Sequence, residues 1–160
     1  MVPKIMKNRF LQAIVFSLLF VGCTSHDVYF QYSPVSSNGW SKDTSYVFRI
    51  PITDTAATYN VYINVRNRGE YPYQNLWLFL REVTPDTIRT KDSVECYLAD
   101  QRGKWLGKGI GSIMEMPILY LQNVKFSKPG TYRYDIVQGM RDSLLLGIND
   151  IGMRVEKVNK

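Results

Sequence analysis

The sequence predicts an all-β protein, a single antiparallel β-sandwich of jelly-roll or immunoglobulin-like type behind a signal segment. In TYNVYINVRN, residues 58–67, apolar Val61, Ile63 and Val65 alternate with more polar residues, the period of a half-buried strand. Similar short segments recur along the chain, separated by turn sequences such as NRGEYP, VTPD, DQRGK and SKPG. No helical period persists long enough to predict βαβ units, so an antiparallel sandwich is favoured.

Residues 1–22 have the pattern of a signal peptide. Lys4, Lys7 and Arg9 form a basic head, and FLQAIVFSLLFV, residues 10–21, is apolar apart from Gln12 and Ser17. A transmembrane helix needs roughly 20 predominantly apolar residues, so this shorter run does not fit a permanent span. Cleavage is therefore the better interpretation.

Cys23 follows the small residue Gly22 at the end of this run. The arrangement resembles the signal of bacterial lipoproteins, although Phe20 stands where that pattern usually has Leu, which occurs one residue earlier as Leu19. The resemblance implies that Cys23 is acylated and becomes the new N-terminus. Acyl chains contribute about 0.8 kcal/mol per buried CH₂, so several of them anchor a protein stably. The alternative, an ordinary buried cysteine in an uncleaved helix, leaves the basic head unexplained.

After the anchor we expect a tether and one domain. Residues 23–39 are predicted to be the lipidated cysteine and an exposed tether that ends in a turn-rich patch, and residues 40–160 the β-sandwich, whose length suits a single core. One expected strand, NLWLFLREV at 75–83, is more continuously apolar, which predicts burial on both sides or a central place in the sandwich, with a short helix as the alternative. The other expected strands are TSYVFRIPI, TYNVYINVRN, SVECYLAD, PILYLQNVKF, TYRYDIVQGM and GINDIGMRVEKV.

Composition argues against several classes of function. The formal charge of +6 falls to about +3 without the leader, and the remaining basic residues are spread among acids, so nucleic-acid binding is not expected. Cys96 is the only cysteine besides Cys23, and the only histidine, His26, lies beside the anchor. We therefore expect no disulfide, no metal site and no cofactor, and Cys96 is better read as a small buried residue than as a nucleophile. Candidates for a pair of catalytic carboxylates stand singly in the sequence: Glu70, Glu82, Glu95 and Glu115.

The glycine-rich run WLGKGIGS, residues 105–112, matches neither phosphate-binding spacing. Read with period two, Gly103, Trp105, Gly107 and Gly109 fall on one nearly bare face. Such glycines mark bulges or a close approach of another backbone or a ligand. A hairpin or close packing against the following segment is the favoured interpretation, and a docking groove is the alternative.

Aromatic residues are abundant, and an exposed row of them could stack on sugar rings or cover a protein partner. Most are expected in the core or on the sheets, because large aromatic residues dominate both cores and interfaces. The ones singled out are Tyr71, Tyr73, Trp77, Tyr132 and Tyr134.

The order of several motifs resembles the gliding-motility lipoprotein GldH family of Bacteroidota. In that family a lipidated cysteine precedes a β-rich domain with a Gly-Trp-Gly-Gly pattern, a Gly-x-Tyr segment, Gln-x-Met-Arg, Leu-x-x-Ile and a Val/Ile-Gly turn. The matching residues here are Cys23; Gly103, Trp105, Gly107 and Gly109; Gly130 and Tyr132; Gln138, Met140 and Arg141; and Leu145, Ile148, Ile151 and Gly152.

The resemblance implies a non-enzymatic envelope component linked with gliding motility and its secretion machinery. Anchored by lipid on the outer membrane and facing the periplasm, it would dock on other envelope proteins, with the glycine-rich strand or its aromatic neighbours as the candidate surface. A glycan-binding module is the second hypothesis, whereas a small-molecule ligand or an enzyme is not favoured. Arg141 is first expected to be an internal clamp, with Asp142 or Asp150 as its partner.

Overall fold

The computed structural model describes residues 26–158, which consist of β-strands and their connections. The signal peptide predicted at 1–22 and the lipidation predicted at Cys23 lie outside these residues. The strands are β1 (Asp27–Pro34), β2 (Trp40–Ser41), β3 (Tyr46–Ile52), β4 (Tyr59–Arg68), β5 (Asn75–Val83), β6 (Arg89–Tyr97), β7 (Lys108–Ile110), β8 (Ile113–Val124), β9 (Gly130–Gln138), β10 (Leu144–Leu145) and β11 (Ile148–Lys157).

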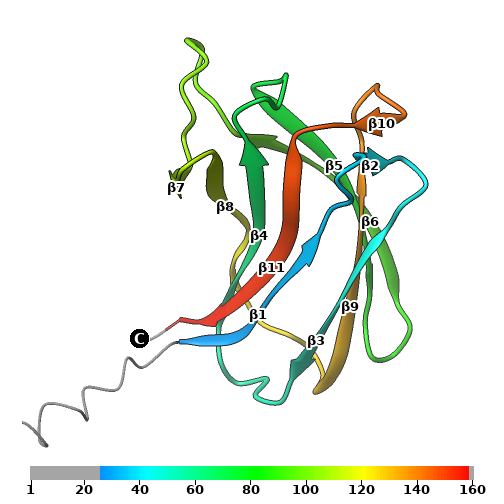
Figure 1. Ribbon diagram of the computed structural model, residues 1–160. Coiled ribbons are helices and arrows are strands. Elements are labelled where there is room, and N and C mark those ends of the chain that lie inside the picture. The colour runs from blue at the N-terminus through cyan, green and yellow to red at the C-terminus, as the bar shows by residue number, and fades with distance from the viewer. Residues whose placement is uncertain (1–25, 159–160) are drawn as a thin grey trace, which may run out of the picture.

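The strands form a jelly-roll sandwich (Figure 1). One sheet has the order β1-β11-β4-β8-β7, the facing sheet has the order β3-β9-β5-β6, and β10 pairs with β2 in a short separate ladder. The main antiparallel pairs are nested, since β1 pairs with β11, β3 with β9, β4 with β8 and β5 with β6. In a jelly roll the first strand pairs with the last, the second with the one before it, and so on inward. The all-β prediction is therefore confirmed, and of its two alternatives the jelly roll is the one observed.

Alternation along the strands builds the core between the two sheets. Val61, Ile63 and Val65 of β4 are fully buried, as their period-two spacing predicts. β5 is central in its sheet, as expected, but the prediction that it is buried on both sides is wrong. Its leucines face the core, whereas Trp77 is 38% exposed and Phe79 is 54% exposed on the outer face.

Residues 27–34 form strand β1, so the expectation of an exposed tether reaching to residue 39 is wrong. β1 lies at a sheet edge and pairs with β11 from Asp27↔Glu156 to Pro34↔Asp150. None of its side chains is fully buried, so this strand lacks the buried stripe on which a strand prediction depends. Its terminal Pro34 is compatible with an edge strand.

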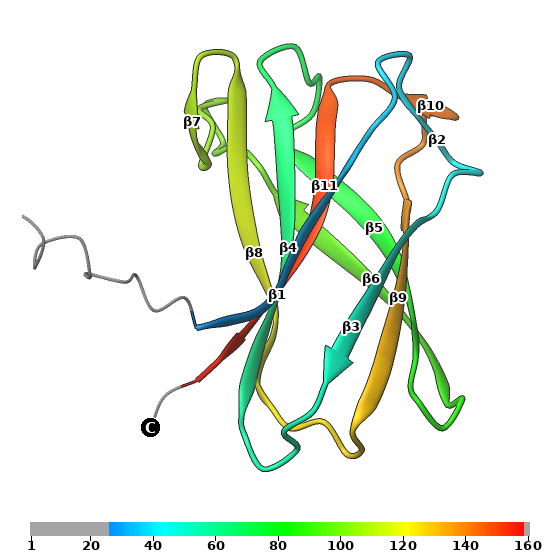
Figure 2. The ribbon, with the colours of Figure 1, turned by 60° about the horizontal axis from the view of Figure 1, so that its bottom comes forward.

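The two ends of the sandwich differ (Figures 1 and 2). The described chain starts and stops at one end, here called the terminal end, where the Lys157 N–H donates to the His26 carbonyl oxygen at 2.9 Å. The opposite end, here called the distal end, holds the β4–β5 loop, the long segment between β6 and β8, and the connection from β9 to β11.

Candidate functional site

Gln138, the last residue of β9, organises the connection that follows it. Its side chain is 1% exposed. Its Nε2 donates to the Asp142 carbonyl oxygen at 2.7 Å and to the Trp40 carbonyl oxygen at 3.4 Å, while its Oε1 accepts from the Met140 N–H at 2.8 Å. A buried amide needs such partners, and these fix the path of residues 139–142.

Gly139 and Met140 bind this connection to β5. The Gly139 N–H donates to the Trp77 carbonyl oxygen at 2.7 Å, and the Trp77 N–H donates to the Met140 Sδ at 3.2 Å. A Cβ on Gly139 would lie 3.1 Å from the Phe79 ring. The connection therefore continues along β5 and lies against two outward-facing aromatic side chains.

Arg141 is exposed and is not the internal clamp that was expected. Within residues 26–158 its guanidinium forms no ion pair or hydrogen bond, and only its carbonyl oxygen is used, by the Lys42 Nζ at 2.8 Å. Asp142 accepts from the Tyr73 hydroxyl at 2.7 Å, and Asp150 accepts from the Asn149 amide at 2.6 Å. The carboxylates proposed for Arg141 thus have other partners.

These residues line a cavity at the distal end. It has a volume of about 400 Å³ and is lined by Tyr73, Trp77, Gly139, Met140 and Arg141. We call it the distal pocket. It combines two partly exposed aromatic rings, a flexible thioether and a guanidinium without a partner in the described chain, a composition suited to binding rather than to bond breaking.

Tyr71 joins the Gly-Trp-Gly-Gly segment to the distal pocket. Its ring centroid lies 5.8 Å from that of Tyr73 and 6.5 Å from that of Trp105. Gly147 passes so close that an added Cβ would lie 2.6 Å from the Tyr71 Cα. Trp105 therefore lies against the buried Tyr71 ring and does not line the distal pocket. Of the motif residues singled out from the sequence, Met140 and Arg141 line that pocket and Gln138 holds their connection, whereas Gly103, Gly107 and Gly109 do not line it.

The glycines of β7 are explained by the hairpin interpretation. β7 pairs with β8 around Gly111, which has φ +69°. A Cβ on Gly107 would lie 2.6 Å from the Glu115 carbonyl oxygen, and one on Gly109 would overlap the Ile113 carbonyl. Gly103 has open space around it but adopts φ +79°, a turn conformation that favours glycine. Close backbone approach thus accounts for the bare face.

The described residues contain no assembled catalytic or metal-binding set. Cys96 is fully buried, and burial raises the pKa of its thiol to about 12, so the reactive thiolate is not formed at neutral pH. No group of three or more His, Cys, Asp or Glu side chains gathers within residues 26–158. The four singled-out glutamates have separate partners: Glu70 with Arg68, Glu82 with Tyr134, Glu95 with Asn75 and Glu115 with Arg66.

The aromatic residues divide between core and surface. Tyr71, Tyr132 and Tyr134 are buried, at 4% exposure or less, whereas Tyr73 and Trp77 are 36% and 38% exposed and line the distal pocket. The sequence analysis singled out Tyr73 and Trp77 but could not distinguish these exposed residues from the buried tyrosines. The outward place of Trp77 and Phe79 was missed, although the alternation of Leu with Trp, Phe and Arg in LWLFLR was a signal for it.

Comparison with known proteins identifies the family. The sequence profile of GldH lipoproteins matches residues 27–155, nearly the whole described chain. The chain belongs to the GldH lipoprotein family. A GldH homolog of Christiangramia forsetii, named a gliding motility lipoprotein, is 35% identical over 147 residues, covering 88% of this chain and 90% of the relative. The gliding motility lipoprotein GldH of Flavobacterium johnsoniae is 33% identical over 158 residues, covering 94% and 97%.

Among solved structures, a chain of the infectious bursal disease virus VP2 subviral particle is similar at a TM-score of 0.34 and 14% identity. The likeness covers 83% of this chain and 31% of that one, and it is too distant to bear on function. No segment of residues 26–158 forms a helix that could cross a membrane.

Proposed function

We propose that this GldH family protein is a lipid-anchored envelope component that acts without catalysis, by docking on other proteins linked to gliding motility and its secretion machinery. The observation that carries the proposal is the distal pocket itself, where Met140 and Arg141 lie with the partly exposed rings of Tyr73 and Trp77, at the end of the sandwich opposite the start of β1. A lipid on Cys23 would hold the terminal end near the membrane. The distal pocket would then face away from it, where a partner can reach.

The anchor and its location belong to the same proposal. Cys23 would carry the acyl chains, and residues 24–27 lack the run of acidic residues that directs some lipoproteins of this phylum to the cell surface. We therefore assign the protein to the outer membrane, facing the periplasm. The names of both relatives, which are gliding motility lipoproteins, support the envelope role.

Arg141 is the docking residue with the sharpest test. Its exposed guanidinium can form a bidentate pair with a partner carboxylate, and such pairs are enriched at the centres of interfaces. The aromatic rings of Tyr73 and Trp77 supply apolar area beside it. Together they form a small anchor site rather than a broad apolar surface.

The test is crosslinking of the lipidated full-length chain in its native membranes, followed by affinity capture and mass spectrometry. We expect capture of envelope proteins of motility or secretion, lowered by Cys23→Ala through loss of the tether and by Arg141→Ala through loss of the contact. Lys125→Ala is the matched control and should leave capture unchanged, because it removes an exposed cation from the β8–β9 connection, which lies at the terminal end (Figure 1). Capture of no protein by a folded, lipidated chain would refute the docking function.

A glycan is the second candidate occupant of the distal pocket. The observation that favours it is the pair of partly exposed rings, Tyr73 and Trp77, beside the polar group of Arg141. Aromatic faces beside hydrogen-bonding groups suit sugar rings. A glycan array probed with the intact chain and with Trp77→Ala tests it, and the absence of any glycan signal that depends on Trp77 would remove this function.

A further inference from the structure

The outer face of the four-stranded sheet carries a row, here called the apolar row, whose Phe79 ring stays partly exposed although Gly139 lies against one edge of it. Phe79 of β5 is 54% exposed and lies in register with Val137 of β9 and with Ser93 of β6. Aromatic side chains standing on an outer sheet face expose apolar area to water, and such area in natural proteins often marks an interaction site. This row lies beyond the distal pocket, farther along β5.

The next row on the same face is charged. Asp135, Arg81 and Lys91 lie in register across β9, β5 and β6. Asp135 is 4% exposed and uses both oxygens, accepting from the Arg133 Nε at 2.6 Å and from the Arg81 Nη2 at 2.9 Å. One carboxylate therefore holds two guanidinium groups in place.

The positive charge of Lys91 is not neutralised by a carboxylate of the described chain in this way. Lys91 is paired directly with Arg81 across the strands, and like charges in that position destabilise a sheet. Its ammonium forms no hydrogen bond or ion pair with any residue of 26–158. Arg49 and Arg133 form a second directly opposed cationic pair on this face. Like charges directly opposite each other destabilise a sheet, and an anionic partner would offset that cost.

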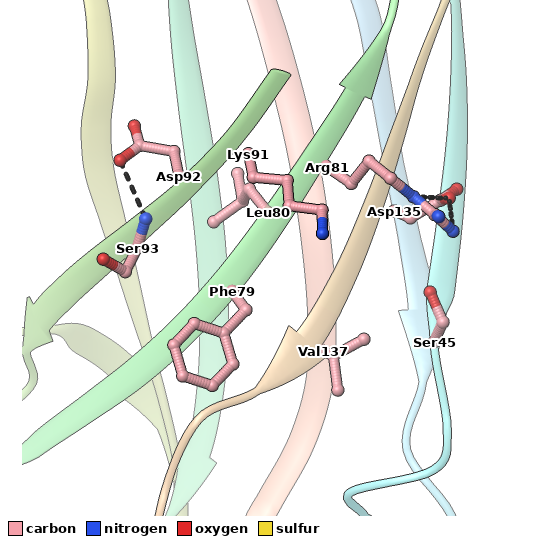
Figure 3. A pocket seen from close by; sticks show the side chains of 9 residues that line it. All are labelled: Ser45, Phe79, Leu80, Arg81, Lys91, Asp92, Ser93, Asp135 and Val137. Atoms are coloured by element: carbon pink, nitrogen blue, oxygen red, sulfur yellow. Dashed lines mark hydrogen bonds and ion pairs between the residues drawn. The ribbon is translucent and has the colours of Figure 1, made fainter. Parts of the chain in front are cut away.

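The two rows enclose a cavity of about 600 Å³, here called the sheet pocket. Its lining includes Phe79, Val137 and Ser93 from the first row and Arg81, Lys91 and Asp135 from the charged row. The other carboxylate in the lining, Asp92, accepts from the Ser93 N–H at 2.8 Å and from the Tyr120 hydroxyl at 3.2 Å. Figure 3 shows the Lys91 side chain reaching across β5 toward the space between Phe79 and Arg81, while Arg81 turns away toward Asp135. The cation without a partner thus points into the cavity, next to its apolar wall.

We propose that the sheet pocket binds an acidic segment of a partner polypeptide, with an apolar side chain of the segment between Phe79 and Val137 and a carboxylate on Lys91. Charge complementarity selects the acid, since the outward side chains of this sheet are mainly cationic: Arg49, Arg81, Arg89, Lys91 and Arg133 against Asp135 and Glu95. The apolar row selects the polypeptide, because a phosphorylated headgroup would pair with the cations and leave Phe79 uncovered, whereas a neutral glycan would cover Phe79 and leave the cations without a counter-charge.

The inference rests on the proposed docking function and assigns it a second surface. The test places a photo-crosslinking amino acid at Phe79 in the full-length lipidated chain within native membranes. We expect an adduct with one protein, and the attached peptide, sequenced by mass spectrometry, should carry Asp or Glu beside an apolar residue. Lys91→Glu should lower the adduct yield by about fivefold. Lys125→Glu, the same charge reversal at the terminal end, should not.

An adduct with lipid or glycan, an attached peptide without acids, a yield unaffected by Lys91→Glu, or no adduct at all would overturn the inference. The same crosslinker at Arg141 separates the two proposals. A protein adduct at position 141 without one at position 79 would refute only the proposal for the sheet pocket. The absence of protein adducts at both positions would also count against the proposed docking function. Thermal unfolding of each variant checks that it folds, which both exposed positions should allow.

Discussion

Replacement of Gln138 by Met should loosen the connection that builds the distal pocket. Met has a similar shape and length, so the change removes hydrogen bonds and leaves little cavity. The lost partners are the Asp142 carbonyl oxygen at 2.7 Å and the Met140 N–H at 2.8 Å. Each intramolecular bond contributes about 0.5–1.5 kcal/mol net, and a buried partner left unsatisfied costs roughly 1–3 kcal/mol. We expect Gln138→Met to lower the free energy of unfolding by about 2–4 kcal/mol.

Urea denaturation measures this loss, and hydrogen exchange locates it. The Met140 N–H should lose protection, whereas the N–H groups of central β4 should keep theirs apart from the global change. Gln31→Met is the matched control, since Gln31 is exposed and bonds only to the Tyr29 hydroxyl, so its effect should stay within about 0.5 kcal/mol. A loss below about 1 kcal/mol in Gln138→Met would refute the assignment of Gln138 as the organiser of the connection.

Three further predictions concern the hairpin, the buried thiol and acid stability. Gly109→Ala would push a Cβ into the backbone of β8 and should cost about 1–3 kcal/mol by urea denaturation, whereas Gly69→Ala enters open space and should be nearly neutral. Because burial raises the pKa of its thiol, Cys96 should not react with a thiol reagent at pH 8 in the folded chain and should react once urea unfolds it. A second reactive thiol in urea would show that Cys23 carries no acyl group. A hydrogen bond from Thr84 and the charge of Lys128 lower the pKa of Asp86 from 3.8 to about 2. The ionised Asp86 carboxylate therefore stabilises the folded state fully above about pH 4, and this contribution is lost as the pH falls toward 2. Asp86→Asn should flatten that part of the stability profile, and an unchanged profile would show that the pair with Lys128 does not contribute.

Strands with one buried face could be predicted from the sequence, and the strand without one could not. The alternation of Val61, Ile63 and Val65 reports burial directly, and the core confirms it. β1 is held mainly by pairing with β11 at the other end of the chain, and pairing over that distance leaves no local pattern. The burial of β5 was predicted wrongly because Trp77 and Phe79 on the outer face continue the apolar run of the core-facing leucines, so composition alone does not show which side is exposed.

Motif order singled out only two of the residues that line the distal pocket, and none of their contacts. Met140 and Arg141 could be singled out by motif order, but their approach to Tyr73 and Trp77 depends on the nested pairing of the strands. Sequence proximity made Asp142 the expected partner of Arg141, yet the Tyr73 hydroxyl from another loop takes that carboxylate. Competition between donors that are distant in sequence decides such pairs, and one sequence does not reveal it.

The pairing of β1 with β11 also determines how the protein would carry load. If the membrane holds the chain before Asp27 and a partner holds the distal end, tension runs along the axis of β1. The hydrogen bonds of an antiparallel ladder lie across that axis, so they are sheared together and do not open one at a time. A jelly roll tethered through its first edge strand is thus a mechanical coupler that resists pulling from its own anchor.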